Sequence, residues 1–323
     1  MNQLYDLAIL GGGPAGVAAG VYASRKRLKT VFITKDFLGQ SSVSDGIENW
    51  IGTVKISGVD LSKSLEVHLR AYAGNIVDIK EGVGVKNVEK MSGGDFGKDS
   101  GFKVTTDAGE FFTKTVLVTT GSHRRKLEGV KGADVFEHKG LTYCATCDGP
   151  LFADQDVAVI GGGNAAFESA AQLLAYCKSV TLLNRSETFR ADPVTVDKLR
   201  ANPKMKILTN AVPTEVTGEK FVSGLTYKDA KLGAAGDASA FNSLAVSGIF
   251  VEIGSLPTTF FVKDVAKLNE YGNIIVDPRT QRSSTDGIWA AGDCTDGLYH
   301  QNNIAAGDAV KALEDIYGYL HAK

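Results

Sequence analysis

The chain has 323 residues, of which 43% are hydrophobic and 22% charged, and its formal net charge at pH 7 is −2. This length favours two domains of a globular protein, and the near-neutral charge argues against nucleic acid or an anionic membrane as a partner. No apolar run is long enough to span a bilayer, residues 1–6 lack a basic signal-peptide region, and the four cysteines are too few for a secreted disulfide framework. We therefore expect a cytoplasmic protein.

The chain begins with a nucleotide-binding pattern. The apolar run 7–10 predicts a strand that ends at the sequence Gly-Gly-Gly-Pro-Ala-Gly of residues 11–16. A helix over 17–26 and a strand over 30–33 then complete a βαβ unit. In such a unit the first glycine makes the tight turn, the second lets the backbone approach a pyrophosphate, and the third keeps helix and strand close. The free N–H groups of the helix N-terminus favour the phosphates.

A cysteine pair follows near the middle of the chain, where Cys144 and Cys147 are separated by two residues and followed by Asp148. Thiols at this spacing can close a small disulfide ring, and beside an electron-supplying cofactor such a ring is a redox relay. Half of a zinc site is the alternative, but the sequence has no second CxxC and no near pair of histidines. For Asp148 the alternative is a helix cap. No metal site is expected.

The βαβ pattern then returns. Apolar residues 157–160 lead into Gly-Gly-Gly-Asn-Ala-Ala at 161–166, a helix that runs through Leu174, and a strand over 180–183. One such fingerprint is weak evidence, but two in the right local context predict an α/β protein. Such a protein binds two dinucleotides, or binds one and keeps a second site that has lost its ligand.

The last informative strand precedes Asp293. Residues 287–293 read as a buried strand that ends in small residues and one acid, which can meet the ribityl or pyrophosphate part of a flavin held at the first fingerprint. An ordinary strand followed by an Asp turn is the alternative. Residues 91–101 and 231–241 predict exposed loops. Cys177 is expected to be buried and inert. Cys294 is expected to be buried, with an approach to the flavin as the alternative.

Taken together, these residues resemble one family, the low-molecular-weight thioredoxin reductases, which are FAD-dependent pyridine nucleotide-disulfide oxidoreductases. The flavoprotein component of alkyl hydroperoxide reductase belongs to the same group, and the runs 147–152 and 292–295 are most similar to it. The resemblance covers essentially the whole chain, with its motifs in family order. These motifs are residues 11–16, Gln40, Glu48-Asn49-Trp50, residues 144–148, residues 161–166, and Gly292-Asp293 through Gln301.

The resemblance implies two Rossmann-like domains of three-layer ββα type, the second inserted into the first. Residues 1–119 and 253–323 are expected to form the FAD-binding domain, and residues 120–252 the NAD(P)H-type domain that carries the CxxC centre. We expect a stand-alone reductase core that forms a homodimer, and a rotation of the second domain between flavin reduction and electron transfer.

The resemblance also implies roles for the site residues. Cys147 is expected to face the flavin, Cys144 to be the exposed thiol that attacks the partner's disulfide, and Asp148 to give and take the proton. The expected FAD-binding residues are Gly11, Gly13, Pro14, Ala15, Gly16, Thr34, Gln40, Asn49, Asp293, His300 and Gln301. The expected NAD(P)H-binding residues are Gly161, Gly163, Asn164, Ala166, Arg185 and Arg190.

The implied activity passes electrons from NAD(P)H through FAD and the cysteine pair to thioredoxin or a thioredoxin-like protein, with a peroxiredoxin system as a further candidate. Two departures leave alternatives open. Where NADPH-using members have His and Arg, this chain has Asn184 and Ser186, so the choice between NADPH and NADH stays open. His300 and the aromatic tail (Tyr317, Tyr319, His321) leave open ferredoxin, flavodoxin or a second flavin as the donor. A non-catalytic flavin-binding redox sensor is the second alternative.

Overall fold

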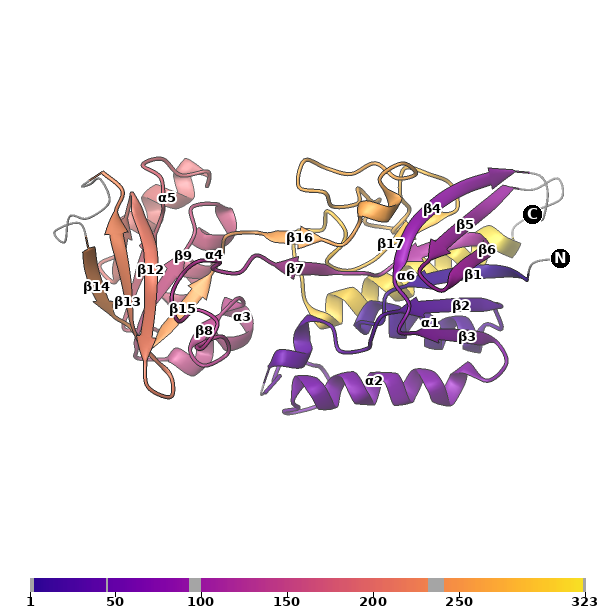
Figure 1. Ribbon diagram of the computed structural model, residues 1–323, viewed down its shortest axis with the longest axis horizontal. Helices are drawn as coiled ribbons and strands as arrows, with labels where there is room; N and C mark the ends of the chain where they lie inside the picture. The colour runs from indigo at the N-terminus through magenta and orange to yellow at the C-terminus, as the bar shows by residue number, and fades with distance from the viewer. Residues whose placement is uncertain (1–2, 45, 93–99, 232–240, 322–323) are drawn as a thin grey trace. The chain divides into compact units, whose positions relative to one another are not determined.

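In the computed structural model, residues 3–44, 46–92, 100–231 and 241–321 are described, and they divide into two units (Figure 1). The first unit contains residues 1–123 and 256–323, and the second, residues 124–255, is inserted into it. Most of the two loops predicted at 91–101 and 231–241 lies outside the described residues, although the ends of both segments belong to strands or turns.

The first unit is built on a mixed sheet in which a parallel set of strands is extended by an antiparallel pair. Its described strands follow the order β3 (Val77–Glu81), β2 (Thr30–Thr34), β1 (Leu4–Leu10), β6 (Gly109–Val118), β5 (Ser100–Thr106) and β4 (Val85–Ser92), with β17 (Ile288–Ala290) also paired to β6. The helices are α1 (Pro14–Arg25), α2 (Gly58–Ala73) and α6 (Asn302–His321), with short 3-10 turns η1 (Gln40–Val43) and η5 (Phe260–Val262).

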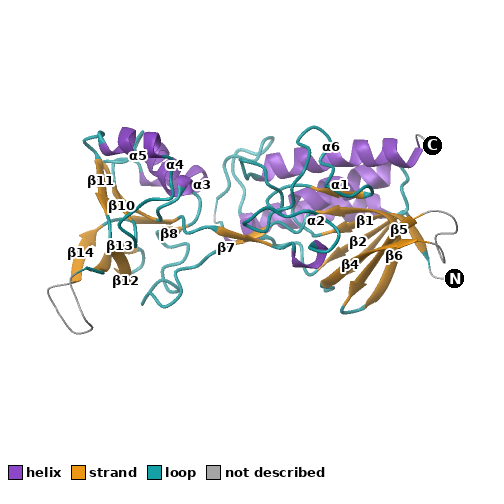
Figure 2. Cartoon of the chain, turned by 90° about the horizontal axis from the view of Figure 1, so that it is seen from above, coloured by secondary structure: helices purple, strands orange, loops and turns teal. Residues whose placement is uncertain are grey.

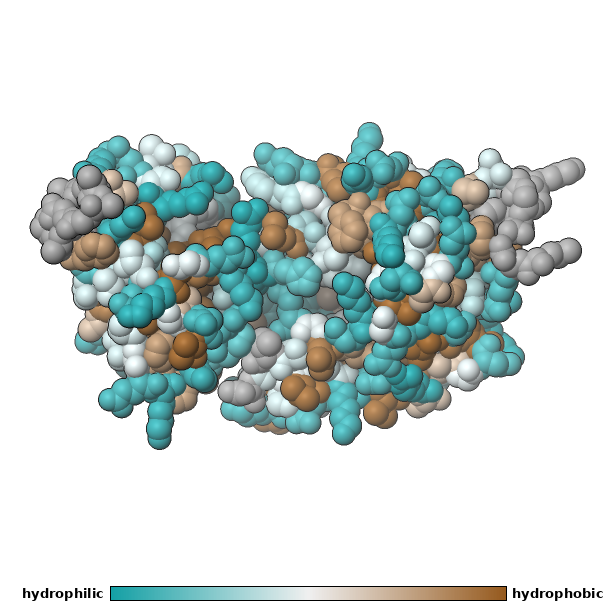
Figure 3. Space-filling view, in the orientation of Figure 1, coloured by the Kyte–Doolittle hydropathy of each residue, from teal (hydrophilic) through white to brown (hydrophobic). Residues whose placement is uncertain are grey.

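The two faces of this sheet carry different cores because successive strand side chains point to opposite sides. In β1, Leu7 and Ile9 pack with the helices, whereas Ala8 and Leu10 pack with β4, β5 and the segment 260–276. Figure 2 shows the helices of this unit gathered on one side of its strands. On the face of the molecule seen in Figure 3, hydrophobic residues are scattered among hydrophilic ones, in keeping with the burial of the large apolar side chains in these cores.

The second unit has a fully parallel sheet between a helical layer and a second, antiparallel sheet. The parallel order is β11 (Met205–Leu208), β10 (Ser179–Leu183), β9 (Asp156–Ile160), β15 (Gly248–Val251) and β8 (Leu141–Thr142). The helical layer contains α3 (Ala145–Asp148), α4 (Asn164–Leu173), α5 (Pro193–Arg200) and the turn η3 (Gly149–Phe152), and the antiparallel sheet contains β12 (Ala211–Gly218), β13 (Val222–Asp229) and β14 (Phe241–Ala245). The predicted α/β fold with two Rossmann-like units is confirmed.

The two segments that connect the units run as paired strands, β7 (Ser122–Arg124) and β16 (Ser255–Pro257). Each lies at a boundary between the units. Among the described residues, no helix is both long enough and apolar enough to cross a membrane.

The aromatic residues Tyr317, Tyr319 and His321 belong to the last helix, α6. Tyr317 stacks on His321 with ring centroids 4.2 Å apart, and Tyr319 packs edge-on against the buried Trp289 at 5.3 Å. The 20 residues of α6 extend over about 30 Å. Because α6 begins beside the predicted flavin residues, its aromatic residues lie toward the opposite end of the helix.

Asp315 holds the end of α6 to the sheet, and its removal tests this packing. Its Oδ2 accepts hydrogen bonds from Trp289 Nε1 (2.9 Å) and Arg282 Nε (2.5 Å). We expect Asp315→Ala to lower the free energy of unfolding by about 2 kcal/mol, since the buried indole N–H loses its acceptor. Urea unfolding measures this change. In the control Asp197→Ala, an exposed pair with Arg200 is lost and the change should stay below about 0.5 kcal/mol; equal losses in the two variants would contradict the prediction.

Candidate active site

The first glycine fingerprint combines tight packing with one open position. Gly11 has φ +120°, and a Cβ at Gly16 would clash with the carbonyl oxygen of Gly11, so α1 can start this close to β1 only with glycine there. A Cβ at Gly13, in contrast, would meet no atom within 4 Å. Pro14 opens the helix and Ala15 is buried behind it. The open position beside a helix N-terminus is where a pyrophosphate would approach the backbone.

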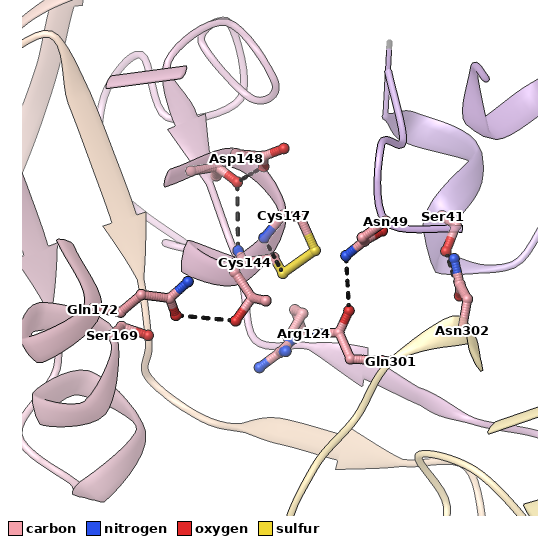
Figure 4. Close-up of a disulfide and its surroundings, with 12 residues drawn as sticks. Ser41, Asn49, Arg124, Cys144, Cys147, Asp148, Ser169, Gln172, Gln301 and Asn302 are labelled. Carbon is pink, nitrogen blue, oxygen red and sulfur yellow. Dashed lines mark hydrogen bonds between the residues drawn. A yellow bond between two sulfur atoms is a disulfide. The ribbon is translucent and has the colours of Figure 1, made fainter. Parts of the chain in front are cut away.

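Four other residues predicted to bind FAD form two hydrogen-bonded pairs, and the members of each pair are about 250 positions apart in the sequence. Gln40 Nε2 donates to Asp293 Oδ2 at 3.5 Å. Asn49 Nδ2 donates to Gln301 Oε1 at 3.1 Å (Figure 4). The same two segments are also joined by Ser41 and Asn302, whose side chains are 2.9 Å apart (Figure 4). The predicted residues thus form one polar cluster at the start of α6.

The remaining two predicted FAD residues differ in their surroundings. Thr34 is buried and its hydroxyl donates to the carbonyl of Asp36 at 2.5 Å, so its side chain shapes the end of β2. His300 Nε2 is buried and has no hydrogen-bond partner among the described residues. A buried ring nitrogen without a partner fits a polar atom of a ligand. The open position at Gly13 and this nitrogen together fit FAD.

The second fingerprint repeats the first with Ala166 in the third position. Ala166 is fully buried against the strand, and a Cβ at Gly163 would meet no atom within 4 Å. Gly161, the turn residue, lies against the carbonyl of Glu252. The open position is therefore present in both units, as a bound dinucleotide requires.

The loop after β10 is fastened to this fingerprint through its backbone. The N–H of Arg190 donates to the carbonyl of Gly162 at 2.8 Å, and the N–H of Asp192 donates to Asn164 Oδ1 at 2.8 Å. Asn164 therefore holds the loop through its side chain. Arg185 and Arg190 are exposed, and neither forms an ion pair with a described residue.

The side chain of Asn184, a position where the family resemblance implies a histidine in NADPH-using members, faces inward. It is 5% exposed, and Nδ2 donates to the carbonyls of Ser186 and Thr188, both at 2.9 Å. The residue thus shapes the loop that presents the two arginines. A sequence shows the exchange of His for Asn, but not the direction in which the new side chain points.

The cysteine pair lies at the start of α3 and forms a disulfide, with Cα atoms 5.3 Å apart (Figure 4). Cys144 is the N-cap, and its Sγ accepts a hydrogen bond from the N–H of Cys147 at 3.2 Å. Cys147 is exposed and Cys144 is half-buried, because the capping sulfur is turned toward the helix backbone. The free cysteines Cys177 and Cys294 are buried as predicted, and burial raises their pKa to about 11 and about 12.

Asp148 ends α3 and faces back toward β8. Its carboxylate accepts a hydrogen bond from the Thr142 hydroxyl. Burial raises the pKa of Asp148, while the Thr142 bond and the charge of His138 act in the opposite direction. A carboxyl that keeps its proton above the usual range suits proton transfer to a thiolate. Cys144 is the N-cap residue of α3, and Asp148, the N-cap residue of η3, makes no side-chain capping bond there.

Sequence reasoning missed one buried polar cluster beside the second fingerprint. Glu252 is 8% exposed, accepts a hydrogen bond from Ser169 Oγ at 2.7 Å, and lies 3.7 Å from Arg124. Burial raises the pKa of Glu252, and Arg124 opposes this. The cluster connects α4 and the end of β15 with β7. Its members are scattered along the chain, so no local motif indicated it.

The family model of the pyridine nucleotide-disulphide oxidoreductases matches residues 5–309. The chain belongs to this family. It is 38% identical over 320 residues to the F subunit of alkyl hydroperoxide reductase of Staphylococcus aureus, with 99% of this chain and 60% of the relative covered. The chain thus spans about 60% of the length of the curated relatives it matches.

Two solved structures cover the whole length. Thioredoxin reductase from Streptococcus pyogenes is 33% identical with a TM-score of 0.87, and each chain is covered completely. Thioredoxin reductase from Giardia duodenalis is 29% identical with a TM-score of 0.89, and 99% of each chain is covered. The predicted family resemblance and the predicted oxidoreductase class are confirmed. The family uses FAD and NAD(P)H, in agreement with the predicted cofactors.

The open position at Gly13 leads to a prediction about flavin content. Because Gly13 has extended backbone with φ −73° and no close neighbour, Gly13→Val should fold normally but block the approach of FAD. We expect FAD to bind at least about tenfold more weakly, with the free energy of unfolding of the flavin-free protein changed by less than about 0.5 kcal/mol. Flavin absorbance after titration and urea unfolding measure the two quantities.

Gly163→Val is the matched control, since it makes the same change in the second unit. It should keep the flavin. Unchanged FAD affinity in Gly13→Val would show that the open position is not part of the flavin site.

Proposed function

We propose that the protein is an NADPH-dependent, FAD-containing dithiol–disulfide reductase that acts on thioredoxin or a thioredoxin-like protein. The observation that carries this proposal is the Cys144–Cys147 disulfide with Asp148 in the same unit as an open second fingerprint. In the balanced reaction, NADPH, one proton and a partner disulfide give NADP⁺ and a partner dithiol. FAD, when bound, supplies the carrier that accepts a hydride and passes two electrons to a disulfide.

Each unit takes one cofactor in this proposal, so the predicted domains 1–119 with 253–323 and 120–252 correspond to FAD and NADPH. In the first unit, the backbone at Gly13 would hold the pyrophosphate, and Asp293, Gln301 and the free Nε2 of His300 would hold the rest of FAD. These assignments are supported by the polar cluster at the start of α6.

The choice of NADPH is supported by charge at the end of β10. Arg185 and Arg190 are exposed on a loop tied to the fingerprint, and an uncharged residue, Asn184, ends the strand where an acid would hold the ribose hydroxyls of NADH. Two guanidinium groups provide the planar donors that suit a 2′-phosphate.

The protein's own residues carry the thiol chemistry. After the disulfide is reduced, the N–H of Cys147 stabilises negative charge on the sulfur of Cys144, which attacks the partner's disulfide. The thiolate released from the partner takes a proton, and Asp148 is the nearby acid. Cys147 then displaces the partner and closes the ring again.

Thioredoxin is the first partner to test, because the full-length structural relatives are thioredoxin reductases. A peroxiredoxin system is a second destination, suggested by the relatives that are alkyl hydroperoxide reductase subunits. We also propose a cytoplasmic homodimer. No observation in the described residues favours ferredoxin, flavodoxin or a second flavin as donor, since the aromatic residues of α6 pack within their own unit.

The nucleotide preference is tested by anaerobic titration of the flavin absorbance with NADPH and NADH. NADPH should bleach the flavin at lower concentration. Arg185→Ala with Arg190→Ala should raise the KM for NADPH by about tenfold or more, since charge-assisted hydrogen bonds to the phosphate are lost, and should leave the KM for NADH nearly unchanged. Arg200→Ala, an exposed arginine of α5, is the control. Equal effects on NADPH and NADH would contradict the assignment.

The cysteine roles are tested by Cys144→Ser. We expect NADPH to reduce the flavin at the normal rate, while thioredoxin turnover falls by at least about 10³-fold because the nucleophile is lost. Stopped-flow absorbance and thioredoxin-coupled NADPH oxidation measure the two steps. Cys177→Ala, which changes a buried inert cysteine, should retain turnover. Normal thioredoxin reduction by Cys144→Ser would refute the proposed relay.

A further inference from the structure

Thr142 lies between the acid and the cysteines, and no sequence motif had singled it out. It is 5% exposed at the end of β8, where its backbone is paired with the fully buried Phe250 of β15. Its hydroxyl donates to Asp148 Oδ2 and also accepts a long hydrogen bond from the N–H of Cys144 at 3.4 Å. One side chain thus connects the carboxyl to the backbone of the first cysteine.

This arrangement fixes the hydroxyl proton. Because a threonine hydroxyl has one proton, accepting from Cys144 leaves that proton to Asp148. The bond is charge-assisted when Asp148 is ionised, so it stabilises the ionised form and opposes the burial that favours the protonated one. An acid that must release and regain a proton in each cycle needs both forms within reach.

Among the described residues, few other groups face this site. From the segment before β8, His138 contributes positive charge, and its neighbour Glu137 is paired with Lys126 at 2.9 Å. From the segment that follows α4, the buried hydroxyl of Tyr176 lies against Gly149, next to Asp148. Thr142 is the hydroxyl that bonds the Asp148 carboxylate directly.

We propose that Thr142 is a positioning residue of the redox centre, which holds the Asp148 carboxyl beside the cysteine pair and keeps both of its protonation states accessible. Thr142 serves a proton transfer in which the Asp148 carboxylic acid and a cysteine thiolate give a carboxylate and a thiol. The reverse transfer, from thiol to carboxylate, forms the thiolate again. The proposal rests on the proposed dithiol chemistry.

The test measures the reactivity of Cys144 without any partner protein. The FAD-loaded protein is reduced with dithiothreitol, desalted anaerobically, and alkylated with iodoacetamide between pH 4 and pH 10, with modification at Cys144 followed by mass spectrometry. Only the thiolate reacts, so the rate follows the titration of Cys144 and of groups coupled to it. The inflection that disappears in Asp148→Asn is assigned to Asp148.

Thr142→Val should move this inflection upward by about one pH unit, because loss of the bond favours the protonated acid. It should also lower NADPH-dependent thioredoxin turnover at pH 7 by about tenfold. Thr142→Ser, which keeps the hydroxyl, should restore both values. Thr195→Val, which removes a hydroxyl near the carboxylate of Asp192 at the start of α5, is the matched control and should change neither.

Several outcomes would overturn the proposal. The first is an Asp148 inflection that does not move in Thr142→Val, and the second is an equal shift of that inflection in Thr142→Val and Thr142→Ser. The third is a change in the remaining pH profile of Cys144 alkylation when Thr142→Val is added to Asp148→Asn. Thr142→Ala replaces the valine variant if the latter loses its native circular dichroism. If the wild-type protein instead shows the Asp148 inflection but reduces no protein disulfide, the proposed function fails while the role of Thr142 stands.

Discussion

The close approach of a helix to the end of a strand is the constraint on which both predicted nucleotide sites depend. At the first fingerprint, only glycine at position 16 lets α1 begin against the turn at Gly11, and the same contact in the second unit is made by Ala166 against Gly161. Because the helix starts there, its first N–H groups have no partners within the helix and point outward. Gly13 and Gly163 then remain as the positions where nothing in the protein fills the space. The tight packing of helix against strand and the open position beside the helix N-terminus thus both follow from where the helix begins.

The rest of the flavin cluster depends on the return of the chain after the inserted unit. The strand β17 joins β6 in the first sheet, and this pairing carries Asp293 and the start of α6 to the segment that contains Gln40 and Asn49. The two βαβ units and the cysteine pair could be predicted from local residues, because each is encoded within about 30 positions. The contact between Gln40 and Asp293 could not, since no local pattern joins residues so far apart, and only the family resemblance indicated it.

Side-chain direction was the part that the sequence could not specify. Thr34 was expected to bind the flavin, and Asn184 directly precedes an arginine expected to bind the nicotinamide cofactor, yet the polar atoms of both satisfy neighbouring carbonyls in turns. Short polar side chains at a strand end have backbone groups within reach, so they compete with the ligand for the same hydrogen bonds. The direction of such a side chain is therefore decided by the backbone groups next to it in the folded chain.

Burial raises the pKa of both the Cys177 thiol and the Asp148 carboxyl of the second unit, but the consequence for reactivity differs. In Cys177 it raises the pKa against the opposing charge of Lys204, so the thiol stays protonated and unreactive. In Asp148 burial favours the protonated carboxyl, which can transfer its proton. The hydrogen bond from Thr142 and the charge of His138 favour the ionised form, so both forms stay accessible. Cys144 is half-buried, and a backbone N–H faces its sulfur. The chemistry of this centre therefore follows less from which residues are present than from how completely each is desolvated and what donates to it.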